Sequence, residues 1–148
     1  MNRKEVKQKV IDYLSNQIQV IENQINNLSS DAQNDAKSSA GDKHETSLAM
    51  MHLEQEKLNA KLSELINTLQ QAQKLPEEKQ VNKTTVGSIV KTDKATFYVS
   101  VAIPALKVQN QTVVCISPLA PLMQILQNSK EGDELVFNKI SYQIQQIL

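Results

Sequence analysis

The chain has 148 residues, 40% of them apolar and 3% aromatic, and its 16 basic side chains balance 16 acidic ones. This length accommodates one small domain or two very small ones, which excludes an enzyme with separate substrate and cofactor domains. A net charge of zero provides no global attraction to nucleic acid or to a membrane surface. Cys115 is the single cysteine, so intramolecular disulfides and paired-cysteine metal sites are excluded. With no apolar leader and no run of 18 apolar residues, we expect a cytoplasmic protein without membrane contact.

Residues 1–75 contain no proline and one glycine, Gly41. Because these two residue types are the main helix breakers, this half is predicted to be helical with one interruption. Apolar residues recur every three or four positions, which indicates one apolar stripe on each helix. The stripes comprise Val10, Leu14, Ile18, Ile21, Ile25, Leu28 and Ala32, then Leu48, Met51, Leu58, Leu62, Leu65, Leu69 and Ala72, with the polar Gln55 at one position.

The two stripes match in an antiparallel arrangement, because residues such as Ile21 and Leu58 pair with numbers that sum to 79 or 80 throughout. This places the fold-back near residue 40, in agreement with Gly41. We therefore predict an antiparallel coiled-coil hairpin over 1–75, about 50 Å long, with its tip near 38–46. Periodicity alone leaves two interpretations open: a dimerisation coiled coil, or a probe that carries its tip to a distant place.

Beyond a linker at 76–83, the sequence of 84–148 becomes rich in β-branched residues and turn residues. A helix is predicted from Pro118 to Gln127, with Ser117 as its N-cap and an apolar stripe that includes Leu119. The fold class is thus α+β, a long helical hairpin followed by a small domain of an antiparallel sheet and one helix. The expected strands are 88–91, 95–103, 112–116, 134–138 and 141–147.

Few residues could carry chemistry of their own. Cys115 falls in a predicted buried strand, where a lone thiol is a packing residue. His44 and His52 have no third ligand at a suitable spacing for zinc. Four basic residues at the N-terminus could contact nucleic acid, although a solvated helix end is the favoured interpretation. They are Arg3, Lys4, Lys7 and Lys9.

Asp42 and Glu45 lie three residues apart at the start of the second helix, so both carboxylates are expected on one helix face. Such a pair could hold one side of a divalent cation, with the other oxygens supplied by water or by another macromolecule. The same spacing also suits a capping box, in which Asp42 is the N-cap. The two roles are compatible, because a cap uses only part of the lone-pair capacity of a carboxylate.

The tip sequence, from Gly41 to Thr46, resembles the G-D-x-x-E-N motif of the bacterial Gre transcript-cleavage factors. Four later segments resemble the same family in the same order: Thr85 to Val90, Ile116 to Leu122, Lys130 to Val136 and Tyr142 to Ile144. The resemblance implies that the C-terminal domain has an FKBP-like fold and that the partner is RNA polymerase. It further implies that the hairpin tip enters the secondary channel of the polymerase.

In this family the tip acids help to hold the second magnesium ion and orient the water that cleaves backtracked RNA. The resemblance thus implies that Asp42 and Glu45 assist catalysis in trans, sharing Mg²⁺ with the polymerase and contacting the RNA 3′ end only indirectly. The chain itself would be a monomer, not an enzyme, and would bind no cofactor alone.

The sequence departs from the family where Thr46 to Ala49 replace its N-A-E-Y continuation, which removes an aromatic residue. Two alternatives therefore stay open: a Gre-like inhibitor that occupies the channel without stimulating cleavage, and a coiled-coil adaptor in which Asp42 and Glu45 only cap a helix.

Overall fold

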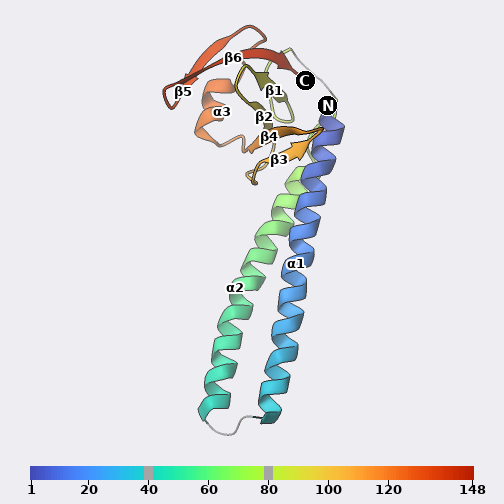
Figure 1. Cartoon of the computed structure of the whole chain (residues 1–148), viewed down its shortest axis with the longest axis vertical. Helices are drawn as coiled ribbons and strands as arrows, with labels where there is room; N and C mark the ends of the chain where they lie inside the picture. The colour runs from blue at the N-terminus through green and yellow to red at the C-terminus, as the bar shows by residue number, and fades with distance from the viewer. Residues whose placement is uncertain (39–41, 79–81) are drawn as a thin grey trace. The chain divides into compact units, whose positions relative to one another are not determined.

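A computed structural model describes residues 1–38, 42–78 and 82–148; the side chains of residues 32–38 and 42–44 are outside the description. Two long helices, α1 (Arg3–Ser38) and α2 (Asp42–Gln73), precede a sheet and a short helix, α3 (Pro121–Leu126) (Figure 1). The predicted α+β class and its two long N-terminal helices are confirmed. The expected fold-back residue, Gly41, lies outside the described residues.

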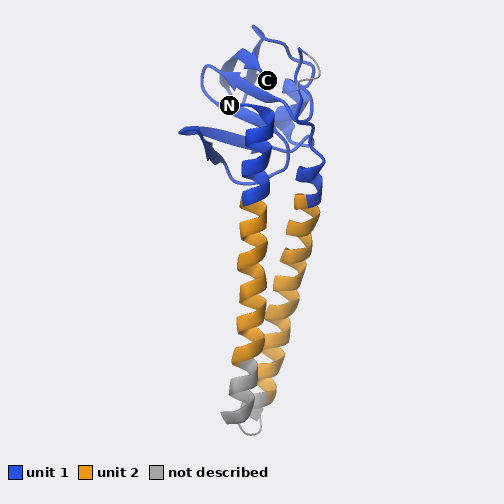
Figure 2. Cartoon of the chain, turned by 90° about the vertical axis from the view of Figure 1, so that its right-hand side faces the viewer, with its two compact units in different colours: residues 1–12, 70–148 blue, residues 13–69 orange. Residues whose placement is uncertain are grey.

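The chain divides into two compact units (Figure 2). Residues 13–69 form one unit, and residues 1–12 together with 70–148 form the other. Each of the two long helices therefore contributes residues to both units. None of the helices in the described parts of the chain is both long and apolar enough to cross a lipid bilayer.

In the unit formed by residues 13–69, α1 and α2 lie side by side (Figures 1 and 2). Burial follows the predicted stripe: on α1, Leu14 and Ile21 are buried, whereas the polar residues on the outer face are exposed. On α2 the partly buried residues recur every three or four positions, with one adjacent pair at 68 and 69. They are Leu48, Met51, Gln55, Leu58, Leu62, Leu65, Thr68 and Leu69.

The second unit contains a six-stranded sheet of order β3-β4-β2-β1-β6-β5 in the described residues. Five of its strands correspond to predicted ones, whereas β3, which follows Pro104, was not predicted. The strands are β1 (Ile89–Thr92), β2 (Thr96–Val99), β3 (Leu106–Val108), β4 (Gln111–Ile116), β5 (Glu134–Phe137) and β6 (Ile140–Ile147).

The prediction of a purely antiparallel sheet is wrong, because β2 and β4 pair in parallel, from Thr96 opposite Val113 to Val99 opposite Ile116. The intervening β3 forms a hairpin with β4 around Gln109 and Asn110. This arrangement gives the apolar β4 two neighbouring strands, as a buried strand requires. It leaves the short β3, with its exposed Lys107, at the edge of the sheet.

The prediction for α3 is also partly wrong. The helix begins at Pro121, and Ser117 does not cap it, since its N-cap position is Ala120 and no side chain caps it. Instead, the Ser117 hydroxyl accepts a hydrogen bond from the Leu119 backbone N–H at 3.1 Å in the preceding turn. Leu119, expected on the apolar stripe, is 88% exposed. Two prolines close together favour this turn over a longer helix.

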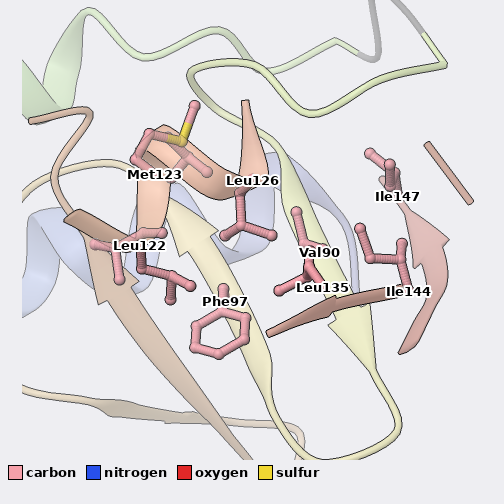
Figure 3. Packing of buried hydrophobic residues seen from close by; sticks show 10 residues of the cluster. Val90, Phe97, Leu122, Met123, Leu126, Leu135, Ile144 and Ile147 are labelled. Atoms are coloured by element: carbon pink, nitrogen blue, oxygen red, sulfur yellow. The ribbon is translucent and has the colours of Figure 1, made fainter. Parts of the chain in front are cut away.

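The core of this unit lies between α3 and one face of the sheet (Figure 3). Leu122, Met123 and Leu126 from α3 are buried there, as their helical spacing predicts. Successive side chains of a strand point to opposite faces, so alternate residues such as Phe97 and Val99 share the core face. On β6 the register shifts opposite Lys91 and Thr92, and Ile144 and Ile147, three residues apart, both reach the core. The sheet residues of this core are Val90, Phe97, Val99, Ile116, Leu135, Ile144 and Ile147.

Gly87 is predicted to contribute to the stability of the fold. Its φ is +85°, and a Cβ atom there would lie 2.6 Å from Cγ of Pro76. Gly87→Ala should therefore lower the free energy of unfolding by about 2 kcal/mol, measured by urea denaturation. Gly132→Ala is the matched control, because Gly132 has φ +92° and no atom within 4 Å of its Cβ position. Equal losses in the two variants would show that the Pro76 contact contributes nothing.

Candidate functional site

The two predicted tip acids lie in the first turn of α2. Asp42 is the first residue of this helix, and Glu45 follows three residues later. Residues with this spacing on a helical backbone lie on the same side of the helix. The Glu45 side chain is exposed, whereas the Asp42 side chain lies outside the described residues, and so does the capping role predicted for it. The backbone places both residues in the first turn of α2, and the predicted orientation of the Asp42 carboxylate lies outside the described residues.

Two carboxylates alone cannot complete the six-oxygen shell of a magnesium ion. Within the described part of the chain, no group of three or more His, Cys, Asp or Glu side chains gathers in a metal-binding arrangement. The predicted His52 is exposed on α2, and the side chain of His44 lies outside the described residues. In the first turn of α2, the structure shows one exposed carboxylate, that of Glu45.

The later segments that carry the family resemblance form turns and packing contacts. Gly132 has positive φ in the turn before β5, where the Lys130 backbone N–H donates to Oδ2 of Asp133 at 2.8 Å. Tyr142 packs edge-on against Phe97, with ring centroids 5.7 Å apart. These segments shape the sheet and its turns.

The interpretation of the N-terminal basic residues as solvated, or as a contact for nucleic acid, is wrong for Arg3 and Lys7. Both side chains are buried in the unit that contains the sheet. The Arg3 guanidinium donates to the backbone oxygen of Glu78 at 2.8 Å and to the Ser88 hydroxyl at 3.2 Å. Lys7 Nζ donates to the Leu75 carbonyl at 2.9 Å and to Oε1 of Glu77 at 3.1 Å.

The spacing of these residues could have revealed this burial. Arg3 and Lys7 precede Val10 and Leu14 at intervals of four, three and four, so they continue the apolar stripe of α1 towards its N-terminus. Lys4 and Lys9, off this stripe, are exposed. The buried side chains of Arg3 and Lys7 therefore hydrogen-bond the first turns of α1 to the segment that follows α2 and to Ser88, directly before β1.

Burial shifts the pKa values of Arg3, Tyr98 and Cys115. It lowers the pKa of Arg3 and raises the pKa of Tyr98. Tyr98 is fully buried on the sheet face opposite Phe97, and among the described residues its hydroxyl has no hydrogen-bond partner. Burial also raises the pKa of the Cys115 thiol to about 11, against the opposing effect of a hydrogen bond with Ser100. Cys115 is thus a packing residue rather than a nucleophile.

The raised pKa of Cys115 predicts a loss of stability in alkali. The unfolded thiol releases its proton near pH 9 and the folded thiol near pH 11, so the unfolded state binds fewer protons between these values. Relative to Cys115→Ala, the wild type should lose about 2 kcal/mol of unfolding free energy between pH 9 and pH 11. Urea denaturation across this range measures the difference. Parallel pH profiles for the two proteins would show that the thiol titrates normally.

Comparison with known proteins adds no family assignment: no protein-family model matches the chain, and no curated protein matches it in sequence.

Proposed function

We propose that this protein is a Gre-like regulator that binds RNA polymerase and inserts the tip of its helix pair into the secondary channel. In this proposal α1 and α2 form an antiparallel coiled coil, and the sheet domain is FKBP-like and docks at the channel rim. The protein acts as a cytoplasmic monomer and has no enzymatic activity of its own. Support comes from the order of the family-like segments along the sequence.

The observation that carries the proposal is the place of Glu45, an exposed carboxylate in the first turn of the second of two long adjacent helices. α1 has 36 residues and α2 has 32. At about 1.5 Å per residue each helix is roughly 50 Å long, which suits a probe that works at a distance from its docking surface.

The chemistry assigned to the tip is completion of a metal site. Asp42 and Glu45 would supply oxygen ligands to a magnesium ion whose other ligands come from the polymerase, water and RNA. That ion would orient and activate the water that cleaves backtracked RNA. Because two acids cannot hold magnesium on their own, activity would require the docked complex.

A second candidate is a Gre-like inhibitor that occupies the channel without promoting cleavage. The replacement of the family's N-A-E-Y continuation by Thr46 to Ala49 favours it. Both candidates predict the same binding partner and differ in whether backtracked RNA is cleaved.

The experiment that tests the proposal is a binding titration with purified RNA polymerase from the same organism. We expect saturable binding of the fluorescently labelled chain, and competition by the unlabelled chain. Absence of binding to both core polymerase and backtracked elongation complexes would contradict the proposal and leave the coiled-coil adaptor as the remaining interpretation.

A further inference from the structure

Arg3 is a buried cation that forms no ion pair with any of the residues that the structure describes. Two of its nitrogens donate to neutral oxygens, Nη1 to the Glu78 carbonyl and Nη2 to the Ser88 hydroxyl. Its third nitrogen, Nε, is buried and has no hydrogen-bond partner among the same residues. Because a buried charge is costly unless an opposite charge compensates it, this guanidinium favours a negatively charged neighbour.

A second buried hydroxyl without a partner lies close to this guanidinium. Tyr98 is fully buried, and its hydroxyl forms no hydrogen bond within the described ranges of the chain. Val99, the next residue of β2, donates its backbone N–H to the carbonyl of Ser88 at 3.0 Å, and the hydroxyl of Ser88 accepts from Arg3. Burial raises the pKa of Tyr98, and the nearby charge of Arg3 opposes this rise. Two hydrogen-bond donors thus share one buried region of the unit that contains the sheet.

The charges in this buried region do not balance. Lys7 is also buried, and its Nζ pairs with Oε1 of Glu77 at 3.1 Å. Cys115 lies opposite Tyr98 on β4 and is a neutral thiol at neutral pH, because burial raises its pKa to about 11. With Glu77 paired to Lys7, the positive charge of Arg3 stays uncompensated by the described residues around it.

We propose that this region binds a small monovalent anion such as chloride, which accepts hydrogen bonds from Nε of Arg3 and from the Tyr98 hydroxyl. A water molecule can accept the same two bonds, but it leaves the charge of Arg3 uncompensated, whereas an anion satisfies the donors and the charge together. The bound anion would link the first turn of α1 to β2. None of these residues lies at the start of α2, so the anion site is independent of the proposed function.

Urea denaturation of the full chain tests the site through its effect on stability. Chloride replaces gluconate at constant ionic strength, since gluconate is too large for a buried site. About 0.3 M chloride should lower the unfolding equilibrium constant of the wild type about tenfold, as expected for an anion that binds the folded state with a dissociation constant of about 30 mM. The same unfolding equilibrium in both salts would show that a neutral acceptor serves the two donors, and would overturn the proposal.

Three variants separate specific binding from a general salt effect. Tyr98→Phe removes only the unpartnered hydroxyl and should reduce the chloride effect to about twofold or less, and Arg3→Met should abolish it. Lys4→Met is the matched control, because it removes a charge from the exposed side of α1 and should retain the tenfold effect. A chloride effect of equal size in the wild type and in Tyr98→Phe would reject the site, whether or not Arg3→Met folds.

Crystals of the full chain grown in sodium bromide would locate the anion directly, because bromide scatters X-rays anomalously. We expect an anomalous peak within hydrogen-bond distance of both Nε of Arg3 and the Tyr98 hydroxyl. Density for a water molecule at this position, without an anomalous signal, would contradict the proposal.

Discussion

Replacing Asp42 with asparagine and Glu45 with glutamine is expected to reduce stimulated cleavage of backtracked RNA by about 100-fold or more, because in the proposed complex the magnesium ion would lose two charged ligands. Affinity for the polymerase should change little, since each replacement preserves the size of its side chain. The measurement is the rate of 3′-end cleavage in purified, stalled elongation complexes. The control is Glu64→Gln, which removes an exposed carboxylate elsewhere on α2 and should stimulate cleavage as the wild type does.

Asparagine at position 42 also separates the metal role from the capping role. Asparagine caps helices about as well as aspartate, so Asp42→Asn should leave the melting temperature unchanged if the residue is a cap. Asp42→Ala would then lower the melting temperature. Full cleavage activity in Asp42→Asn together with a lower melting temperature in Asp42→Ala would assign the residue to capping and contradict its metal role.

The second prediction concerns the buried lysine of α1. Lys7→Glu is expected to lower the free energy of unfolding by about 3 kcal/mol, because it places a carboxylate against the Leu75 carbonyl and the Glu77 carboxylate in a buried position. Lys4→Glu makes the same charge change on the exposed side of α1 and should cost about 0.5 kcal/mol or less. Chemical denaturation at neutral pH measures both.

Losses of similar size in the two lysine variants would contradict the inward orientation of Lys7. A further check is salt dependence, since the interaction of a buried charge is screened less than that of an exposed one. The deficit of Lys7→Glu should therefore persist in 0.5 M salt.

The two long helices could be predicted because their determinants are local. Proline is absent before Pro76, and the apolar stripe from Val10 to Ala72 has one period throughout. The partial burial of Gln55 shows that this period, and not apolarity at each position, determines which side of α2 is less exposed. The first strand, the β5–β6 hairpin and the buried face of α3 followed from similar local patterns.

The rest depended on non-local contacts. β4 pairs in parallel with β2 because it lies between β2 and β3 in the sheet. The sequence of a short segment does not encode this position. β2 ends at Val99 and α3 begins at Pro121, each next to a turn. In the sequence, the residues of these turns resemble a continuing strand or helix. Arg3 and Lys7 were misassigned because charged residues rarely occupy buried stripe positions. For the candidate site, the sequence predicted the positions of Asp42 and Glu45 at the start of α2, because the helix start is encoded locally.

The most direct test of the central claim is site-specific photocrosslinking of the complex with RNA polymerase. A photoreactive residue at Ser47, exposed in α2 close to Glu45, should crosslink to the walls of the secondary channel near the catalytic magnesium. The same residue at Ser63, exposed further along α2, should crosslink nearer the channel rim. Crosslinks from Ser47 confined to the outer surface of the polymerase, in a complex that forms normally, would contradict insertion of the tip.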